Sequence, residues 1–225
     1  MQPHGDASLA TLPPSVPKRN GSKPGHAAIA LPGFVRCESG RGRGGDARSS
    51  RQSCEKLTSV IRLVRAELHL MEAALAGDDA LAKALGHDVV AGWATFTEAL
   101  QPTRDALAAN PSGSAWGACF FVARDPPELV GWGGFKGPPK DGVVEVGFEI
   151  AEARRGRGLA TAAMRAMLAE AFADERVTAV IAHTLPERNA SNRVLEKDGF
   201  RFEGEAQEDD EVVWRFSLTR PASGA

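Results

Sequence analysis

Three runs in the middle of the chain carry the dense apolar pattern of β-strands. They read GACFFVARD at 117–125, ELVGWGGFKG at 128–137 and GVVEVGFEIA at 142–151. The segments that separate them, RDPPE and KGPPKDG, are strong turn signals. Because these connections are short, the pattern predicts an antiparallel meander of three strands.

Helical patterns dominate the segment before this meander. A first strand is predicted over 59–66, and the Ala-, Leu- and Glu-rich stretch 67–86 predicts one or two helices ending near Gly86. The stretch 94–110 predicts another helix. We expect it to be broken at Pro102, because proline lacks the N–H that an interior helical position requires.

A strand–helix–strand unit follows, with the meander's last strand as its first element. Apolar residues between Leu159 and Ala173 recur at the spacing of one helix face, and the mostly apolar stretch 177–184 predicts a strand covered on both sides. A crossover of this kind is right-handed and makes its two strands parallel. The sequence therefore predicts one parallel pair inside an otherwise antiparallel sheet.

The last predicted elements are a short helix and a hairpin. Asn189 can cap a helix over 189–198, and Gly199 can take the left-handed position just past its end. The stretches 200–206 and 211–219 predict two paired strands. Together the elements predict an α/β fold.

Charge divides the chain into two parts. Of the 225 residues, 43% are hydrophobic and 25% are charged, which is typical of a soluble globular protein, and the net charge is −2. Residues 1–56 hold nine basic and four acidic residues, whereas the remainder holds eighteen and twenty-five. The first segment is also rich in glycine and proline and shows no periodicity. We therefore expect disorder over 1–56, a folded domain over 57–220 and a tail over 221–225.

Several classes of function are not expected from this composition. No apolar run is long enough to span a bilayer, so we expect a cytoplasmic protein with no membrane partner. The run GRGRGG at 40–45 matches a dinucleotide-binding pattern, but no strand precedes it and no helix follows it. The tryptophans lack interleaved basic residues, so no specific nucleic-acid partner is expected. Three irregularly spaced cysteines do not make a zinc pattern, and no metal is expected.

The turn between the predicted strand 142–151 and the helix from Leu159 is suited to an anion. It reads RGRGLA, from Arg155 to Ala160. A helix N-terminus exposes N–H groups that lack intrahelical partners, and the glycines allow a ligand to approach the backbone closely. Two arginines add full charges. The turn therefore indicates a phosphate or pyrophosphate site, although a plain tight turn with solvated arginines would also produce this pattern.

This turn and the order of the elements resemble the GNAT superfamily of acetyl-CoA-dependent N-acetyltransferases. That family carries Q/R-x-x-G-x-G/A here, which Arg155 to Ala160 matches in full. The segments VEVGFEIAEARRGRGLATAA and PERNASNRVLEKDGF look like the branch that includes the ribosomal-protein N-terminal acetyltransferases. The resemblance covers about residues 58–219. It implies a GNAT fold with six to seven strands, a splayed parallel central pair and about four helices.

The resemblance also implies where the co-substrate acetyl-CoA binds. Its pantetheine arm is expected to enter the gap between the splayed strands, and its pyrophosphate to lie on the turn. The cofactor-binding residues expected on this basis are Phe148, Glu149, Ile150, Arg155, Gly156, Arg157, Gly158, Leu159, Ala160, Asn189 and Asn192.

The general base is expected on the strand that precedes the turn. Direct attack of an amine on the thioester requires the ammonium to lose a proton and the oxyanion to receive a donor, expected to be a main-chain N–H near Gly147 or Phe148. Strand alternation places Glu145, Gly147 and Glu149 on one face. Glu145 is the expected base, because it matches a glutamate of the resembled branch, and Glu149 is the runner-up. Both could instead be solvated strand residues.

The residue expected as general acid differs from that of the wider family. Many members use a tyrosine in the helix after the fifth strand, but this chain has no tyrosine, and Leu195 stands at the matching position. In the resembled branch a serine helps instead, and Ser191 matches it; helix capping is the alternative role for that serine. Arg188 stands where the branch usually has asparagine, which puts the expected cofactor contact of Asn189 in question. His183 could relay a proton or be purely structural.

The acceptor is expected to be a primary amine, either a small molecule or a protein N-terminus. The acidic stretch 205–211 could attract a cationic amine or be a solvated hairpin loop. Association into a homodimer is a further expectation. An acyl-CoA-binding sensor with little turnover is the alternative function, motivated by the missing tyrosine.

Overall fold

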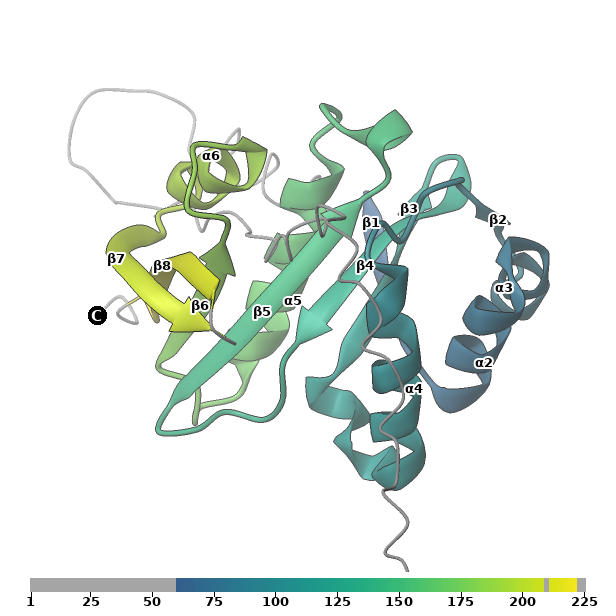
Figure 1. The fold of residues 1–225 in the computed structure, drawn as a ribbon, viewed down its shortest axis with the longest axis horizontal. Helices are drawn as coiled ribbons and strands as arrows, with labels where there is room; N and C mark the ends of the chain where they lie inside the picture. Colours follow the sequence, from purple (N-terminus) through teal and green to yellow (C-terminus); the bar gives the residue numbers. More distant parts are fainter. Residues whose placement is uncertain (1–59, 209–210, 222–225) are drawn as a thin grey trace, which may run out of the picture.

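The computed structural model describes residues 60–208 and 211–221. Within these residues the chain forms one eight-stranded sheet with helices on both faces (Figure 1). The strand order is β1-β3-β4-β5-β6-β8-β7, and the two-residue β2 (Asp88–Val89) pairs in parallel with β4 outside this path. The predicted disordered segment 1–56 and residues 222–225 of the predicted tail lie outside the described residues, as do Asp209 and Asp210 of the acidic loop.

The first half of the sheet is the predicted meander with one strand added. β3 (Ala118–Arg124), β4 (Pro127–Phe135) and β5 (Val143–Ile150) pair antiparallel in sequence order. β1 (Ile61–Arg65) pairs antiparallel with β3 at the edge. The three-strand meander expected from the apolar runs is therefore confirmed.

The helices before the meander differ in detail from the prediction. Stretch 67–86 forms two helices, α2 (Leu68–Ala76) and α3 (Asp78–Leu85), which meet at Gly77. α4 (Leu100–Ala109) begins at Leu100 after a 3-10 turn over Thr97–Ala99, so the expected break at Pro102 is wrong. Pro102 lies in the first turn of α4, where a missing N–H costs no helical hydrogen bond.

The second half of the fold contains the predicted crossover. α5 (Leu159–Ala173) connects β5 to β6 (Ala179–Thr184), which is parallel to β5. α6 (Ala190–Lys197) and the hairpin of β7 (Arg201–Glu208) and β8 (Glu211–Thr219) complete the chain. The prediction of about four helices and six to seven strands becomes five α-helices and eight strands in the described part, because Gly77 divides one helix and β2 adds a short strand.

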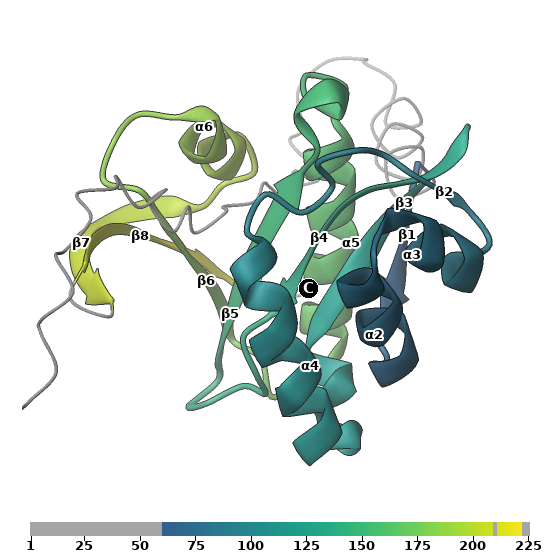
Figure 2. The ribbon, with the colours of Figure 1, turned by 45° about the vertical axis from the view of Figure 1, so that its right-hand side comes forward.

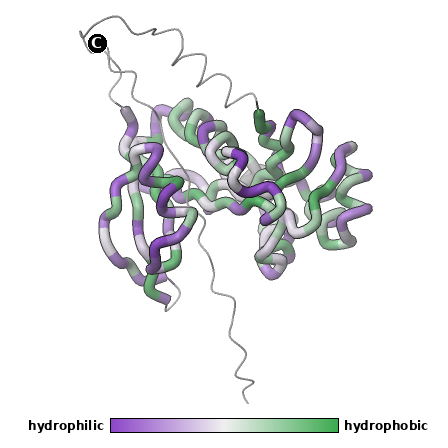
Figure 3. Tube along the Cα trace, turned by 90° about the horizontal axis from the view of Figure 1, so that it is seen from above, coloured by the Kyte–Doolittle hydropathy of each residue, from purple (hydrophilic) through white to green (hydrophobic). Residues whose placement is uncertain are grey.

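Two apolar clusters lie on opposite sides of the meander. α2, α3 and α4 cover one face, whereas α5 covers the other (Figure 2). The larger cluster contains the buried face of α5 and the alternate β5 residues Val144, Val146, Phe148 and Ile150. Figure 3 shows that hydrophobic and hydrophilic residues alternate along the chain throughout the fold. No helix among the described residues is long and apolar enough to cross a membrane.

One buried ion pair joins α5 to the end of α6. Arg165 Nη2 donates to Asp198 Oδ1 at 2.9 Å, and the Asp198 side chain is fully buried. Its second oxygen, Oδ2, has no hydrogen-bond partner in the described structure. Burial raises the pKa of Asp198 from 3.8 to about 6, even though the hydrogen bond from Arg165 acts to lower it.

This pKa predicts a pH-dependent stability that Asp198→Asn should remove. The folded protein holds the proton more tightly than the unfolded chain, so Asp198 makes unfolding easier as the pH rises from about 4 to about 6. A shift of about two units corresponds to about 3 kcal/mol of lost unfolding free energy. Urea unfolding across this range should show wild type losing stability relative to Asp198→Asn. The surface variant Asp79→Asn should track wild type instead, and parallel curves for wild type and Asp198→Asn would contradict the prediction.

Candidate active site

The turn before α5 has the backbone geometry expected of an anion cradle. Gly156 and Gly158 adopt φ angles of 74° and 75°, which L side chains rarely take, and a Cβ at either would meet no atom within 4 Å. Gly158 occupies the N-cap position of α5, and no side chain caps the helix there. The first N–H groups of α5 are therefore left for another partner.

Three arginines surround this turn, but they have different contacts. Arg154 donates through Nε and Nη2 to both oxygens of Glu128, and these hydrogen bonds hold the pKa of Glu128 below its usual value. Arg155 donates through Nε to the main-chain oxygen of Ile150 at 3.1 Å. Arg157 is exposed and makes no side-chain hydrogen bond within the described residues. Arg157 is thus the cation of the motif that is most available to a bound anion.

The parallel strands β5 and β6 separate directly beside the turn. Their pairing is limited to Val143, Val144 and Glu145 against Ala179, Val180 and Ile181. β5 then continues to Ile150 and β6 to Thr184 with no pairing between them, and Figure 2 shows the two strands diverging toward the starts of α5 and α6. The expected splayed pair is confirmed.

The register shows which main-chain groups face this gap. Lys136 donates its N–H to the Glu145 oxygen, and Ala151 donates its N–H to the Val130 oxygen. Odd-numbered residues of β5 therefore direct their main-chain groups toward β4. Because successive residues alternate, Val146, Phe148 and Ile150 direct theirs toward β6. Of the two expected oxyanion donors, the Phe148 N–H thus faces the gap, whereas that of Gly147 faces β4.

The side chains of β5 divide as the alternation predicted. Phe148 and Ile150 pack under α5, whereas Glu145 and Glu149 lie on the opposite face. A Cβ at Gly147, between the two carboxylates, would meet no atom within 4 Å. There is consequently open space beside β5 between the two carboxylates.

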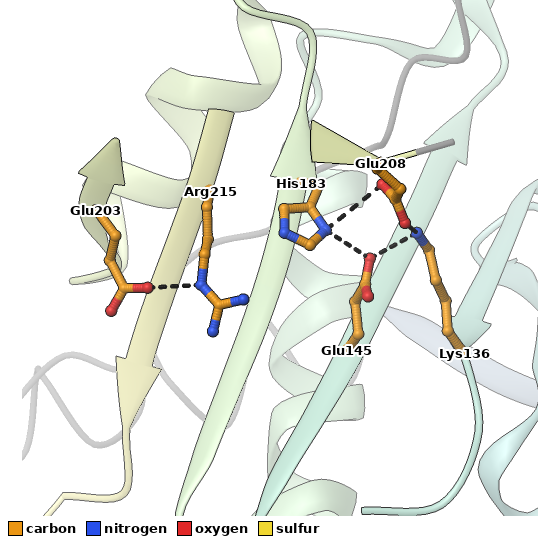
Figure 4. A network of polar contacts seen from close by, with 6 residues as sticks. All are labelled: Lys136, Glu145, His183, Glu203, Glu208 and Arg215. Carbon is orange, nitrogen blue, oxygen red and sulfur yellow. Dashed lines mark hydrogen bonds and ion pairs between the residues drawn. The ribbon is translucent and has the colours of Figure 1, made fainter. Parts of the chain in front are cut away.

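Glu145 belongs to a network of four charged or titratable side chains (Figure 4). Its Oε1 lies 2.9 Å from His183 Nδ1 and 2.5 Å from Lys136 Nζ. Glu208, the last residue of β7, is 2.7 Å from Lys136 Nζ and 3.5 Å from His183 Nδ1. Glu145 is therefore not a solvated strand glutamate, and His183 is part of its immediate surroundings.

The network keeps Glu145 charged. Burial alone would raise the pKa of Glu145, but hydrogen bonds from His183 and Lys136 outweigh it and place this pKa below its usual value. Burial likewise acts to lower the pKa of Lys136, yet its bonds to Glu145 and Glu208 leave that pKa above its usual value. The ligand atoms of Glu145, His183 and Glu208 lie within 4.8 Å of one another, a spacing suited to a metal ion, but here the Lys136 ammonium supplies the positive charge.

Glu149, the runner-up base, has different surroundings. It is 5% exposed and accepts hydrogen bonds from the main chain of Thr95 and Phe96 and from the indole of Trp132. The Glu149 carboxylate is thus buried and surrounded by protein donors, whereas the Glu145 carboxylate is half-buried and lies at the edge of the gap.

The asparagines of α6 form its N-terminal cap. The side chain of Asn189 accepts from the Asn192 N–H, and that of Asn192 accepts from the Asn189 N–H, a reciprocal capping box. Asn192 is fully buried and also donates to Thr184 Oγ1. Asn189 and Asn192 are therefore both engaged in capping the helix. Their expected contact with the cofactor remains a prediction.

Ser191 takes no part in that cap. It is half-buried and makes no side-chain hydrogen bond in the described structure, so the alternative capping role is not seen. Leu195, at the position of the absent tyrosine, is fully buried in the larger core cluster. Ser191 is accordingly the hydroxyl of α6 that remains available at this end of the sheet.

Sequence reasoning missed Lys136 and the donors to Glu149, and it included Glu208 only as part of the acidic stretch 205–211. Hairpin register alone would have suggested Lys136, because Phe135 pairs with Val146 and Lys136, the residue directly after β4, falls opposite Glu145. Glu208 lies 63 positions from Glu145 in sequence, and no local pattern connects them.

Comparison with known proteins assigns the family. Residues 60–201 match the model of the acetyltransferase (GNAT) domain. The chain is a member of the GNAT acetyltransferases. The expected resemblance is thereby confirmed, and the GNAT domain matches most of the described residues.

Relatives of this GNAT domain include a curated protein of Bacillus subtilis (strain 168), YjdG, described as an uncharacterized N-acetyltransferase. It is 30% identical over 146 residues, which cover 64% of this chain and 87% of that protein.

Solved structures share the fold at lower identity. A Salmonella typhimurium acetyltransferase that modifies the N-terminal serine of ribosomal protein L7/L12 has a TM-score of 0.51 at 14% identity, covering 73% of this chain and 98% of that one. The aminoglycoside acetyltransferase AAC(6')-Ib, solved with coenzyme A, has a TM-score of 0.50 at 19% identity, covering 71% and 95%.

The network predicts how Lys136 affects Glu145. Lys136→Met removes a hydrogen bond and a positive charge that both lower the pKa of Glu145, so that pKa should rise. The ¹³C shift of the Glu145 carboxyl in labelled protein, assigned with Glu145→Gln, measures this value directly. Lys140→Met removes a nearby exposed lysine outside the network and serves as the matched control. An unchanged Glu145 titration in Lys136→Met would contradict the network.

Proposed function

We propose that this protein transfers the acetyl group of acetyl-CoA to a primary amine by direct attack of the amine on the thioester. The observation that carries the proposal is the uncapped start of α5, with Gly156 and Gly158 at positive φ, beside the gap between β5 and β6. Membership of the GNAT family and the acetyl transferases among its relatives support it.

The cofactor would lie across the ends of the parallel pair. The pyrophosphate binds the free N–H groups from Gly158 to Ala160, with Arg157 adding a full charge. The pantetheine arm pairs with main-chain groups of Phe148 and Ile150, which have no partner on β6. The Ile150 oxygen, now bonded to Arg155, would be released as the arm binds.

The chemistry divides between the two sides of β5. The amine enters over Gly147 and attacks the thioester carbon, and the Phe148 N–H stabilises the oxyanion. Glu145 accepts the amine proton, directly or through a water, and His183 Nδ1 at 2.9 Å is the next group along the path. As the carbon–sulfur bond breaks, the coenzyme A thiolate leaves, and the Ser191 hydroxyl is the candidate donor of its proton.

The acceptor is a primary amine that approaches a face of mixed charge with an acidic excess. Glu145 and Glu208 lie on the approach, with Lys136 between them. The two carboxylates favour a cationic amine. The ammonium of such a substrate would take the place of the Lys136 ammonium between them. Small-molecule amines and protein N-termini both meet this requirement, as the acceptors named for the two solved relatives illustrate.

The cofactor site is tested by substitution of Gly158. Gly158→Ala and Gly158→Glu place the same strained φ on an L residue, but only the second adds a charge that repels phosphate. Calorimetric titration of the full chain with acetyl-CoA should show that Gly158→Ala binds more weakly than wild type. Gly158→Glu should bind at least tenfold more weakly than Gly158→Ala.

Two other outcomes would be decisive. No binding of acetyl-CoA to wild type would overturn the proposal. Tight binding of acetyl-CoA without release of coenzyme A thiol, across a panel of primary amines, would favour the sensor function instead. The specific reason to consider that function is that the apolar, buried Leu195 stands at the position of the family's tyrosine.

A further inference from the structure

Glu149 fastens a distant segment of the chain to β5. Its Oε2 accepts from the Thr95 N–H at 2.8 Å, and its Oε1 accepts from the Phe96 N–H at 3.3 Å and from Trp132 Nε1 at 2.7 Å. Hydrogen bonds to a carboxylate are roughly twice as strong as neutral ones. The segment that leads into α4 is thereby fixed beside β5 through two successive main-chain groups.

The same segment is anchored on its other side by a tryptophan. Trp93 is 4% exposed, and its Nε1 donates to Asp78 Oδ1 at 3.0 Å. Its ring packs edge-on against Trp132, with 6.0 Å between centroids, and Trp132 is itself a donor to Glu149. Two buried indoles and one buried carboxylate thus determine the path of residues 93–96.

Phe96 is the residue whose placement this arrangement controls. It is half-buried, yet it belongs to neither apolar cluster, unlike the buried phenylalanines of β3, β4 and β5. A partly exposed aromatic outside the core, on a main chain that is held by a buried carboxylate, is not explained by packing within the fold.

The main chain of Phe96 lies close to the open space beside β5. Its N–H is bonded to Glu149, which is two residues from Gly147 on the same face of the strand, about 7 Å away. Nothing lies within 4 Å of a Cβ built on Gly147. Glu145 and its network bound this space from the other side, since Glu145 is two residues away in the opposite direction.

We infer that Phe96 is the apolar wall of the acceptor site and that Glu149 is the positioning residue that holds it there. The acceptor class this selects is a primary amine with an apolar or aromatic group close to the amine, rather than a uniformly hydrophilic amine. The amine lies toward Glu145 and the apolar group lies against Phe96. This inference rests on the proposed function, because it assigns the second substrate of the same site.

The test compares two primary amines on the full-length protein: 2-phenylethylamine and ethanolamine. Phe96→Ala should raise KM for 2-phenylethylamine about tenfold or more, the cost of losing most of an aromatic contact, and leave KM for ethanolamine unchanged. Phe96→Leu should raise KM for 2-phenylethylamine by a smaller factor. The acetyl-CoA dissociation constant, measured by calorimetry, should stay within twofold of wild type in both variants.

The positioning role is tested with Glu149→Gln and a matched control. The glutamine amide would face an N–H donor instead of accepting from it, so the Thr95–Phe96 segment should loosen and KM for 2-phenylethylamine should rise as in Phe96→Ala. Thr95→Ala keeps the main-chain N–H that Glu149 accepts and should behave as wild type. Adding Phe96→Ala to Glu149→Gln should then raise KM for 2-phenylethylamine little further, because both changes remove the same wall.

The outcomes separate this inference from the proposed function. Equal effects of Phe96→Ala on the two amines, or none, would overturn the inference while acetylation itself stands. If wild type acetylates neither amine, NMR titration of both amines into the coenzyme A complex still tests the wall: 2-phenylethylamine should bind more tightly than ethanolamine, and Phe96→Ala should abolish the difference. Absence of that preference in wild type would contradict the inference whatever the activity. Thermal melting of each variant confirms that it is folded.

Discussion

The separation of β5 from β6 is the constraint on which the rest of the structure depends. A parallel pair normally satisfies its main-chain groups along its whole length, but here pairing ends at Glu145 and Ile181. The N–H and oxygen groups of Phe148 and Ile150 are then left facing a gap. Unpaired buried groups of this kind are costly, and Arg155 reduces the cost by donating to the Ile150 oxygen. A ligand that behaves as an extra strand would satisfy the others.

The same separation explains why α5 and α6 begin differently. Both helices follow the ends of the parallel strands, so both N-termini lie at one edge of the sheet. α6 is closed by a reciprocal pair of asparagines, whereas α5 has glycine at its cap and no side-chain acceptor. Because helix starts require partners for their first N–H groups, α5 is the one of these two helices that has no side-chain partner at its start.

Much of this could be predicted from sequence because the relevant signals are local. Turn residues around 125–127 and 137–142 defined the meander, and the paired glycines at Gly156 and Gly158 marked the turn before α5. The Pro102 prediction failed because proline is tolerated in a first helical turn, and the sequence did not show that α4 starts only at Leu100. His183 was considered as a proton relay, but Glu208 and the main-chain donors to Glu149 escaped prediction, because they come from β7 and the loop before α4, which only tertiary folding brings to β5.

The alternation of β5 gives each of its faces one task. Even-numbered residues bury their side chains under α5 and direct their main-chain groups toward β6. Those of Phe148 and Ile150 reach the gap, so these two residues combine core packing with the proposed cofactor contact. Odd-numbered residues direct side chains to the other face, where Glu145 carries charge, Gly147 leaves space and Glu149 holds the segment before α4. A one-residue slip of β5 would exchange the two sets. The register with β4, fixed by five residue pairs, therefore determines both the face that carries Glu145, Gly147 and Glu149 and the main-chain groups that face the gap.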